Sequence, residues 1–104
     1  MIRVTLIRAG ENILGFECKG HAGFAPAGSD IICAAVSILT TTCANALESV
    51  AGKEAEAEVK DGYMRVCLPE REASRDTQII FRTIVQGLSD LAEEYPKYLR
   101  LTEN

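Results

Sequence analysis

The residues best suited to chemistry in this sequence are its single histidine, His21, and a cysteine twelve positions later, Cys33. Both lie in the stretch GHAGFAPAGSDIICAAVS, where a glycine-containing loop leads into an apolar periodic segment. If Asp30 caps a helix there, Cys33 occupies its third position, where the helix dipole and unpaired N–H groups favour thiolate over thiol. A neighbouring imidazole can accept the thiol proton, and N–H groups of the helix start can stabilise an oxyanion. The pair therefore suits nucleophilic acyl transfer.

The segment between the two residues is predicted to fold back, to bring His21 beside Cys33, and to act as a mobile lid over substrate. Gly23 and Gly28 give its backbone the necessary freedom. Phe24 and Pro26 make it partly apolar, which suits contact with apolar side chains of a substrate. The residues of this substrate loop are Ala22, Gly23, Phe24, Ala25, Pro26, Ala27, Gly28 and Ser29.

Other interpretations of the cysteines are open. Cys18, Cys43 and Cys67 fall on the apolar faces of periodic segments, where small core residues are expected. The spacing of Cys18, His21 and Cys33 also suits part of a zinc site, but the sequence offers no second pair of ligands. We therefore expect no metal and no organic cofactor. A redox-sensing Cys33 would need a resolving partner, and Cys18 would have to leave its strand face to reach it.

Hydrophobic periodicity predicts the elements around these residues. Alternation predicts strands in residues 2–8 and 13–19, and two more on either side of the Asp61-Gly62 turn. Helical spacing predicts helices over residues 30–50 and 74–96. Residues 98–101 form a short alternating tail, expected to be an edge strand or a subunit contact. The order ββαββα predicts an α+β sandwich with a small, mainly antiparallel sheet and two principal helices.

Length and composition limit the classes of protein. The 104 residues suit a single domain, residues 1–104, and 47% hydrophobic with 25% charged residues is the balance of a globular protein. A formal net charge of −4 lacks the basic excess of a nucleic-acid binder, so we expect no direct nucleic-acid binding. A local basic patch among Arg65, Arg71, Arg75 and Arg82 is still possible on the sequence alone. No signal peptide and no apolar segment approaching about 20 residues is recognised, which favours a cytoplasmic protein with reduced thiols and no membrane contact.

The motif quoted above resembles that of the ribosomal-processing cysteine protease family, the Prp proteins. Their pattern is G-H-A, a variable glycine-containing loop, and D-I-[VI]-C-A-A-V-S, and the resemblance extends over essentially the whole chain. It implies a catalytic dyad of His21 and Cys33, supported by Gly20, Asp30 and Ser37. Asp30 either caps the helix or orients the imidazole. Ser37 follows Cys33 by one helical turn on the same face.

The resemblance also implies a substrate and an assembly. The substrate would be an N-terminally extended large-subunit ribosomal protein, cleaved after an apolar, aromatic-containing motif by a homodimer. The alternative is a non-catalytic ribosome-assembly or ribosomal-protein-binding module, in which Glu54, Glu56 and Glu58 engage a basic protein and Cys33 only packs. Cleavage by the wild type but not by Cys33→Ala distinguishes the two.

Overall fold

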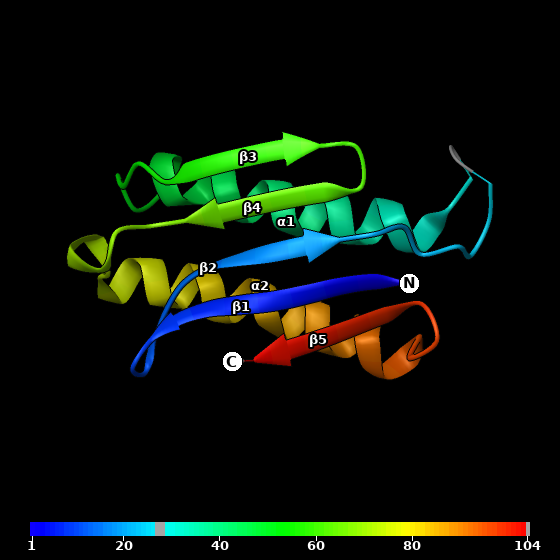
Figure 1. Cartoon of the computed structure of the whole chain (residues 1–104). Coiled ribbons are helices and arrows are strands. Elements are labelled where there is room, and N and C mark those ends of the chain that lie inside the picture. The colour runs from blue at the N-terminus through cyan, green and yellow to red at the C-terminus, as the bar shows by residue number, and fades with distance from the viewer. Residues whose placement is uncertain (27–28, 104) are drawn as a thin grey trace.

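A five-stranded mixed sheet carries both helices on one of its faces (Figure 1). The structure is a computed structural model and describes residues 1–26 and 29–103. The elements along the chain are β1 (Ile2–Ala9), β2 (Asn12–Lys19), α1 (Ile31–Ser49), β3 (Glu56–Lys60), β4 (Tyr63–Cys67), a single 3₁₀ turn (Glu70–Glu72), α2 (Arg75–Glu94) and β5 (Leu99–Glu103). The strands are ordered β3-β4-β2-β1-β5. The predicted α+β class is confirmed.

Two tight hairpins and one long-range pairing build the sheet. Gly10 and Gly62 have φ values of +60° and +66°, which lets the β1–β2 and β3–β4 connections reverse within two residues. β4 pairs antiparallel with β2 and thereby joins the hairpins. β5 pairs parallel with β1, with Leu99 opposite Ile2, so the alternating tail is an edge strand.

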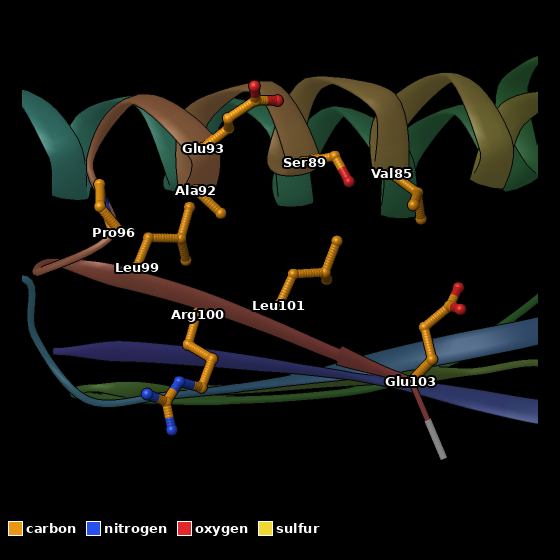
Figure 2. A pocket seen from close by; sticks show the side chains of 9 residues that line it. All are labelled: Val85, Ser89, Ala92, Glu93, Pro96, Leu99, Arg100, Leu101 and Glu103. Carbon is orange, nitrogen blue, oxygen red and sulfur yellow. The ribbon is translucent and has the colours of Figure 1, made fainter.

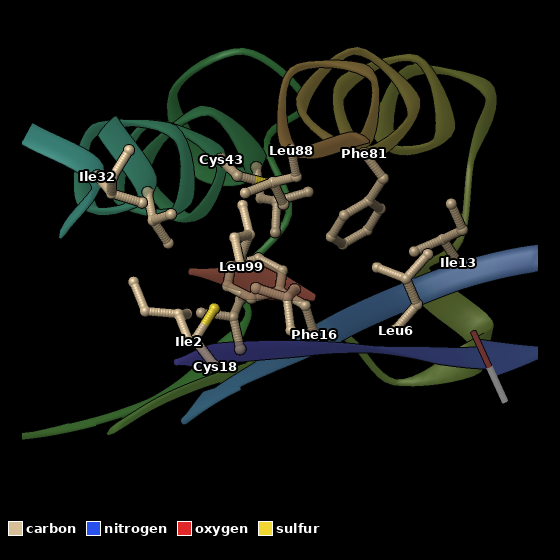
Figure 3. Close-up of a cluster of buried hydrophobic side chains, with 14 of the residues drawn as sticks. Ile2, Leu6, Ile13, Phe16, Cys18, Ile32, Cys43, Phe81, Leu88 and Leu99 are labelled. Carbon is tan, nitrogen blue, oxygen red and sulfur yellow. The ribbon is translucent and has the colours of Figure 1, made fainter. Parts of the chain in front are cut away.

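The core lies between the helices and one face of the sheet (Figure 3). Alternate residues of β1 are buried, as the sequence pattern predicts, and β2 adds Phe16. From the helices, Phe81 and Leu88 of α2 close over the sheet. The predicted stripe of α1 supplies buried residues at Ile32, Val36, Cys43 and Leu47.

α1 is more apolar than its burial requires. By length and composition it would qualify as a membrane span, contrary to the expectation that no segment approaches one. Core helices of folded proteins meet the same two criteria, and the buried stripe of α1 belongs to the core described above. Ile31 and Ile38 remain exposed on its outer side.

β3 extends along the edge of the sheet beside the second half of α1 (Figure 1). All five of its residues are exposed, including Val59, whose exposed fraction is 70%. The alternation of the sequence had placed Ala57 and Val59 on the strand face opposite Glu56 and Glu58. The structure leaves that face uncovered, because α1 does not close over β3. An open space between α1 and the β3–β4 hairpin results, and the candidate site opens into it.

Candidate active site

Asp30 fixes the start of α1 and ties the preceding loop to it. One carboxylate oxygen, Oδ1, accepts hydrogen bonds from the N–H groups of Ile32 and Cys33, both at 3.0 Å. The other, Oδ2, accepts from the N–H groups of Phe24 at 3.0 Å and Ala25 at 3.3 Å. These bonds, that of Cys33 foremost, hold the pKa of the Asp30 carboxyl below its usual value. The capping role of Asp30 is thus the one observed, and Cys33 is the third helical residue.

The same hydrogen bonds engage the helix-start N–H groups that were expected to stabilise an oxyanion. The N–H groups of Ile32 and Cys33 are taken by the Asp30 side chain, and that of Ala34 donates to the Asp30 carbonyl oxygen at 3.1 Å. These three helix-start donors are therefore engaged. The N–H of Ala22, in contrast, donates to the Cys33 sulfur, with an N···Sγ distance of 3.4 Å. A main-chain dipole from the residue after His21 thus points at the thiol.

His21 follows β2 and lies against the β3–β4 turn. Gly20 takes a φ of +94°, and its N–H donates to the carbonyl oxygen of Gly62 at 2.8 Å. The imidazole lies over Gly62 so closely that a Cβ at that position would be 2.8 Å from Nε2. The distance from Nε2 to Oδ1 of Asp61 is 4.0 Å, and both side chains are largely exposed. The β3–β4 turn therefore forms the surface against which the imidazole packs, which we call its seat.

Sequence reasoning recognised Asp61-Gly62 only as a hairpin signal. Nothing in the local pattern connects this turn with His21, some forty residues earlier. The connection comes from the register of β2 with β4, in which Lys19 lies opposite Tyr63. That pairing brings the end of β2 and the β3–β4 turn to the same end of the sheet.

Two cavities meet at the candidate dyad. The first, of about 300 Å³, lies between α1, the end of β2 and the β3–β4 hairpin, and includes the apolar side chains of Val36, Val59 and Met64. The second, of about 620 Å³, lies beside the loop and includes Gly23 and Ala25. Four residues line both cavities: His21, Cys33, Ser37 and Asp61. The structure therefore places His21, Cys33 and Ser37 around the same two cavities, together with Asp61.

The loop is held at both ends of its described part. The Phe24 ring packs edge-on against Tyr98, with centroids 5.2 Å apart, and against Tyr95 at 6.1 Å. The N–H of Ser29 donates to the carbonyl of Pro26 at 3.0 Å. Ala27 and Gly28 of the predicted substrate loop lie outside the described residues. Tyr95 and Tyr98 are contacts of the loop that the helical and strand patterns did not indicate.

The remaining cysteines differ from Cys33 in their surroundings. Burial raises the pKa of both the Cys18 and the Cys43 thiols to about 12, which keeps them protonated at neutral pH. All four cysteines are free, and Cys33 and Cys67 are only partly buried. Within residues 1–26 and 29–103, no group of three or more histidine, cysteine or acidic side chains lies close enough to hold a metal ion.

Another hollow, of about 560 Å³, lies between the second half of α2 and β5 (Figure 2). Val85, Ala92 and Leu101 give it an apolar floor, and Glu93 and Glu103 stand at its rim. Neither a cysteine nor a histidine lines it. It offers shape without a thiol or an imidazole, so the candidate site is placed at the two cavities beside Cys33.

Comparison with known proteins identifies the family. The family model described as cysteine protease Prp matches residues 1–100. This chain belongs to the Prp family of cysteine proteases. Over its full length it is 33% identical to the ribosomal processing cysteine protease Prp of Bacillus subtilis (strain 168), 98% of which is covered. The resemblance inferred from the GHA and DIIC motifs is thereby confirmed.

Solved structures agree with the family assignment. Prp from S. aureus, crystallised with a covalently linked product peptide, superposes with a TM-score of 0.92 at 23% identity, each chain being fully covered. A Streptococcus mutans structure gives a TM-score of 0.88 at 33% identity, over 99% of this chain and 93% of the other. The chain is thus a cysteine protease with the Prp fold, and the site at the start of α1 is the place to seek its nucleophile.

Proposed function

We propose that this Prp-family protease removes the N-terminal extension of a large-subunit ribosomal protein, with Cys33 as nucleophile and His21 as general base. The observation that carries the proposal is the Ala22 N–H directed at the Cys33 sulfur. It sets the main chain of the histidine segment against the thiol at the capped start of α1.

The reaction begins with proton transfer from Cys33 to the imidazole of His21. The thiolate attacks the scissile carbonyl carbon, and the tetrahedral intermediate collapses to a thioester as His21 returns the proton to the leaving amine. A water, deprotonated by His21, then hydrolyses the thioester and regenerates the thiol. The reaction as written requires no metal or cofactor.

The Ala22 N–H has two roles in this scheme. Before attack it stabilises the thiolate by a hydrogen bond to sulfur. It can also donate to the carbonyl oxygen once the S–C bond has formed, whereas the helix-start N–H groups of Ile32 and Cys33 already donate to Asp30. Gly20 supports this arrangement through its bond to the hairpin turn.

The proposed substrate rests on relatives and on the lining of the site. The B. subtilis relative is named a ribosomal processing protease, and an S. aureus Prp structure contains a substrate peptide. In this chain, Val36, Val59 and Met64 present apolar surface in the cavity beside Cys33. Such a cavity suits apolar or aromatic residues before the scissile bond.

We also propose that the enzyme is a cytoplasmic homodimer. The exposed positions Ile31, Ala34 and Ile38 are spaced so that they share one outer face of α1. An apolar helix face of this kind fits burial against a second copy better than contact with water.

The second candidate is that the protein binds the ribosomal protein without cleaving it, and one observation favours this role. Glu56 and Glu58 are exposed on the edge strand β3, where they can engage a basic ribosomal protein. In that case binding would survive loss of the thiol, and the mass of the ribosomal protein would not change.

Intact-mass analysis of the extended ribosomal protein tests both candidates. Wild type should produce one mass loss, at an aromatic-containing site, whereas Cys33→Ala and His21→Ala should each leave the substrate intact. Cys67→Ala, which removes another partly buried thiol, is the matched control and should cleave normally. Cleavage by folded Cys33→Ala would refute the dyad, and no cleavage by folded wild type would favour the binding module.

A further inference from the structure

The helix-free face of the sheet carries a row of basic residues across its full width. Strand registers place Lys60 opposite Tyr63, Tyr63 opposite Lys19, Lys19 opposite Arg3, and Arg3 opposite Arg100. The four cations of this basic row, Lys60, Lys19, Arg3 and Arg100, are all exposed. Strand spacing gives the row a length of roughly 19 Å.

The side of the sheet on which the row lies follows from alternation. Ile2 and Val4 are buried under the helices, so Arg3 between them faces the other way. Figure 2 shows the same for β5, where Leu99 and Leu101 point toward α2 and Arg100 points away from it. No helix covers this face (Figure 1).

The row brings like charges together at a cost to stability. Arg3 lies directly opposite both Lys19 and Arg100, and like charges in directly opposed positions are destabilising. Within the described part of the chain, Lys19 forms an ion pair with Glu17 and Lys60 forms one with Glu58, whereas Arg3 and Arg100 form none. Both pairs are solvent-exposed and therefore weak, so an anionic ligand can compete with them.

The neighbouring row on the same face limits the basic surface. Arg65 lies there between Glu58 and Glu17. The positive charge is therefore concentrated at one end of the sheet, where β2 leads into His21 and the β3–β4 turn seats its imidazole. The basic row and the active site share this end of the molecule.

We propose that the basic row binds the phosphate backbone of single-stranded RNA beside the active site, so that the protease can act on a ribosomal protein carried on RNA. The proposal rests on the proposed function for its substrate. A ribosomal protein rich in lysine and arginine would be repelled by this row, whereas phosphodiesters are attracted to it. Paired guanidinium groups, as at Arg3 and Arg100, are suited to bidentate phosphate contacts.

The shape of the face fits a single strand better than a duplex. Tyr63 lies within the row, between Lys60 and Lys19, and Lys60 Nζ is 5.7 Å from the centre of its ring. An aromatic ring on a flat, cation-lined sheet offers a surface for base stacking along a phosphate chain. The acidic remainder of the chain restricts the proposed RNA contact to this one row, and the titration below decides between it and the expectation of no nucleic-acid binding drawn from net charge.

Fluorescence anisotropy with a fluorescein-labelled twelve-nucleotide oligouridylate, titrated over a series of salt concentrations, tests the proposal. For a single strand the log–log salt slope is roughly −0.7 for each phosphate neutralised. Arg3→Gln/Arg100→Gln should therefore weaken binding and reduce the slope by about 1.4. Arg71→Gln/Arg75→Gln removes the same charge from exposed residues outside the row and should bind as wild type does.

Two controls separate this proposal from folding and from the proposed function. Arg3→Gln/Arg100→Gln should cleave the free extended ribosomal protein at the wild-type rate, which also shows that it is folded. Absence of oligouridylate binding by wild type at low salt, or equal losses in the two double variants, would overturn the RNA proposal. Row-dependent binding of a labelled polyglutamate peptide without RNA binding would overturn it in favour of an acidic protein partner. Failure of all variants to cleave would instead count against the proposed function.

Discussion

Gly62 has no side chain, and this determines where the His21 ring can lie. The imidazole occupies the space that a Cβ would take, with Nε2 within 2.8 Å of that position. Asp61, beside it, places a carboxylate 4.0 Å from the same nitrogen. At the scale of single residues, the proposed base is thus positioned by groups of the hairpin turn.

Gly62→Ala should lower kcat/KM by about 100-fold, since the new methyl group displaces the imidazole and small misplacements of a catalytic group have effects of this size. Gly10→Ala is the matched control, because its φ of +60° imposes the same backbone strain but no atom lies within 4 Å of the added Cβ. Both variants should lose about 1 kcal/mol of stability in chemical denaturation. Equal activity in the two would show that Gly62 matters only for the turn.

Iodoacetamide at neutral pH should modify Cys33 first among the four thiols. Cys33 is partly exposed and its sulfur accepts the Ala22 N–H, whereas burial raises the pKa of Cys18 and Cys43 to about 12. Peptide mass mapping over time measures the order. Cys67 is the informative comparison because it is also partly exposed; faster modification of Cys67 would contradict the proposed activation of Cys33.

At the scale of elements, one carboxylate joins the loop to α1. Asp30 caps the helix with Oδ1 and holds Phe24 and Ala25 with Oδ2, while the Phe24 ring packs on Tyr95 and Tyr98 beyond α2. The loop is therefore anchored to the start of one helix and to the end of the other. A movement of the loop that admitted substrate would have to break both anchors.

Asp30→Asn separates the two functions of that carboxylate. Asparagine caps helices well, so α1 should persist by circular dichroism, but its NH₂ group cannot accept the loop N–H groups. We expect KM to change more than kcat, as the loop loses one anchor. Unchanged KM and kcat would show that Oδ2 does not control substrate access.

The same residue gives a pH dependence of stability. The folded-state pKa of Asp30 is lowered, so its contribution is fully present above the ordinary carboxyl pKa and is lost as pH falls through the lowered value. The melting temperatures of wild type and Asp30→Asn should therefore differ most at neutral pH and converge in acid. Divergence on acidification would contradict this sign.

At the scale of the whole molecule, the apolar outer face of α1 predicts self-association. Sedimentation velocity should show a dimer, and Ile38→Glu should shift it toward monomer because it places a charge on an apolar face. Val50→Glu is the control, since Val50 is equally exposed but follows the end of α1. A monomeric wild type would refute the homodimer.

Much of this architecture was predictable from periodicity, because local patterns determine local elements. Alternation in β1 and β2 and the apolar stripe of α1 indicated which side chains are buried, and the motif placed His21, Asp30 and Cys33. The seat of His21 was not predictable, since it depends on β4 pairing with β2. The partners of the helix-start N–H groups were not predictable either, because a single Asp30 carboxylate accepts hydrogen bonds from both the helix and the loop.

The parallel pairing of β5 with β1 has a consequence for synthesis of the enzyme. Leu99 must find Ile2, and the Phe24 ring must find Tyr95 and Tyr98, across nearly the whole chain. Contacts between such distant segments form late, because a long loop must be closed before they contribute. A nascent chain that has already exposed His21 and Cys33 still lacks the aromatic anchor of the loop, Tyr95 and Tyr98, and the edge strand. The loop beside the candidate site therefore gains its contacts with Tyr95 and Tyr98 only after these residues have left the ribosome.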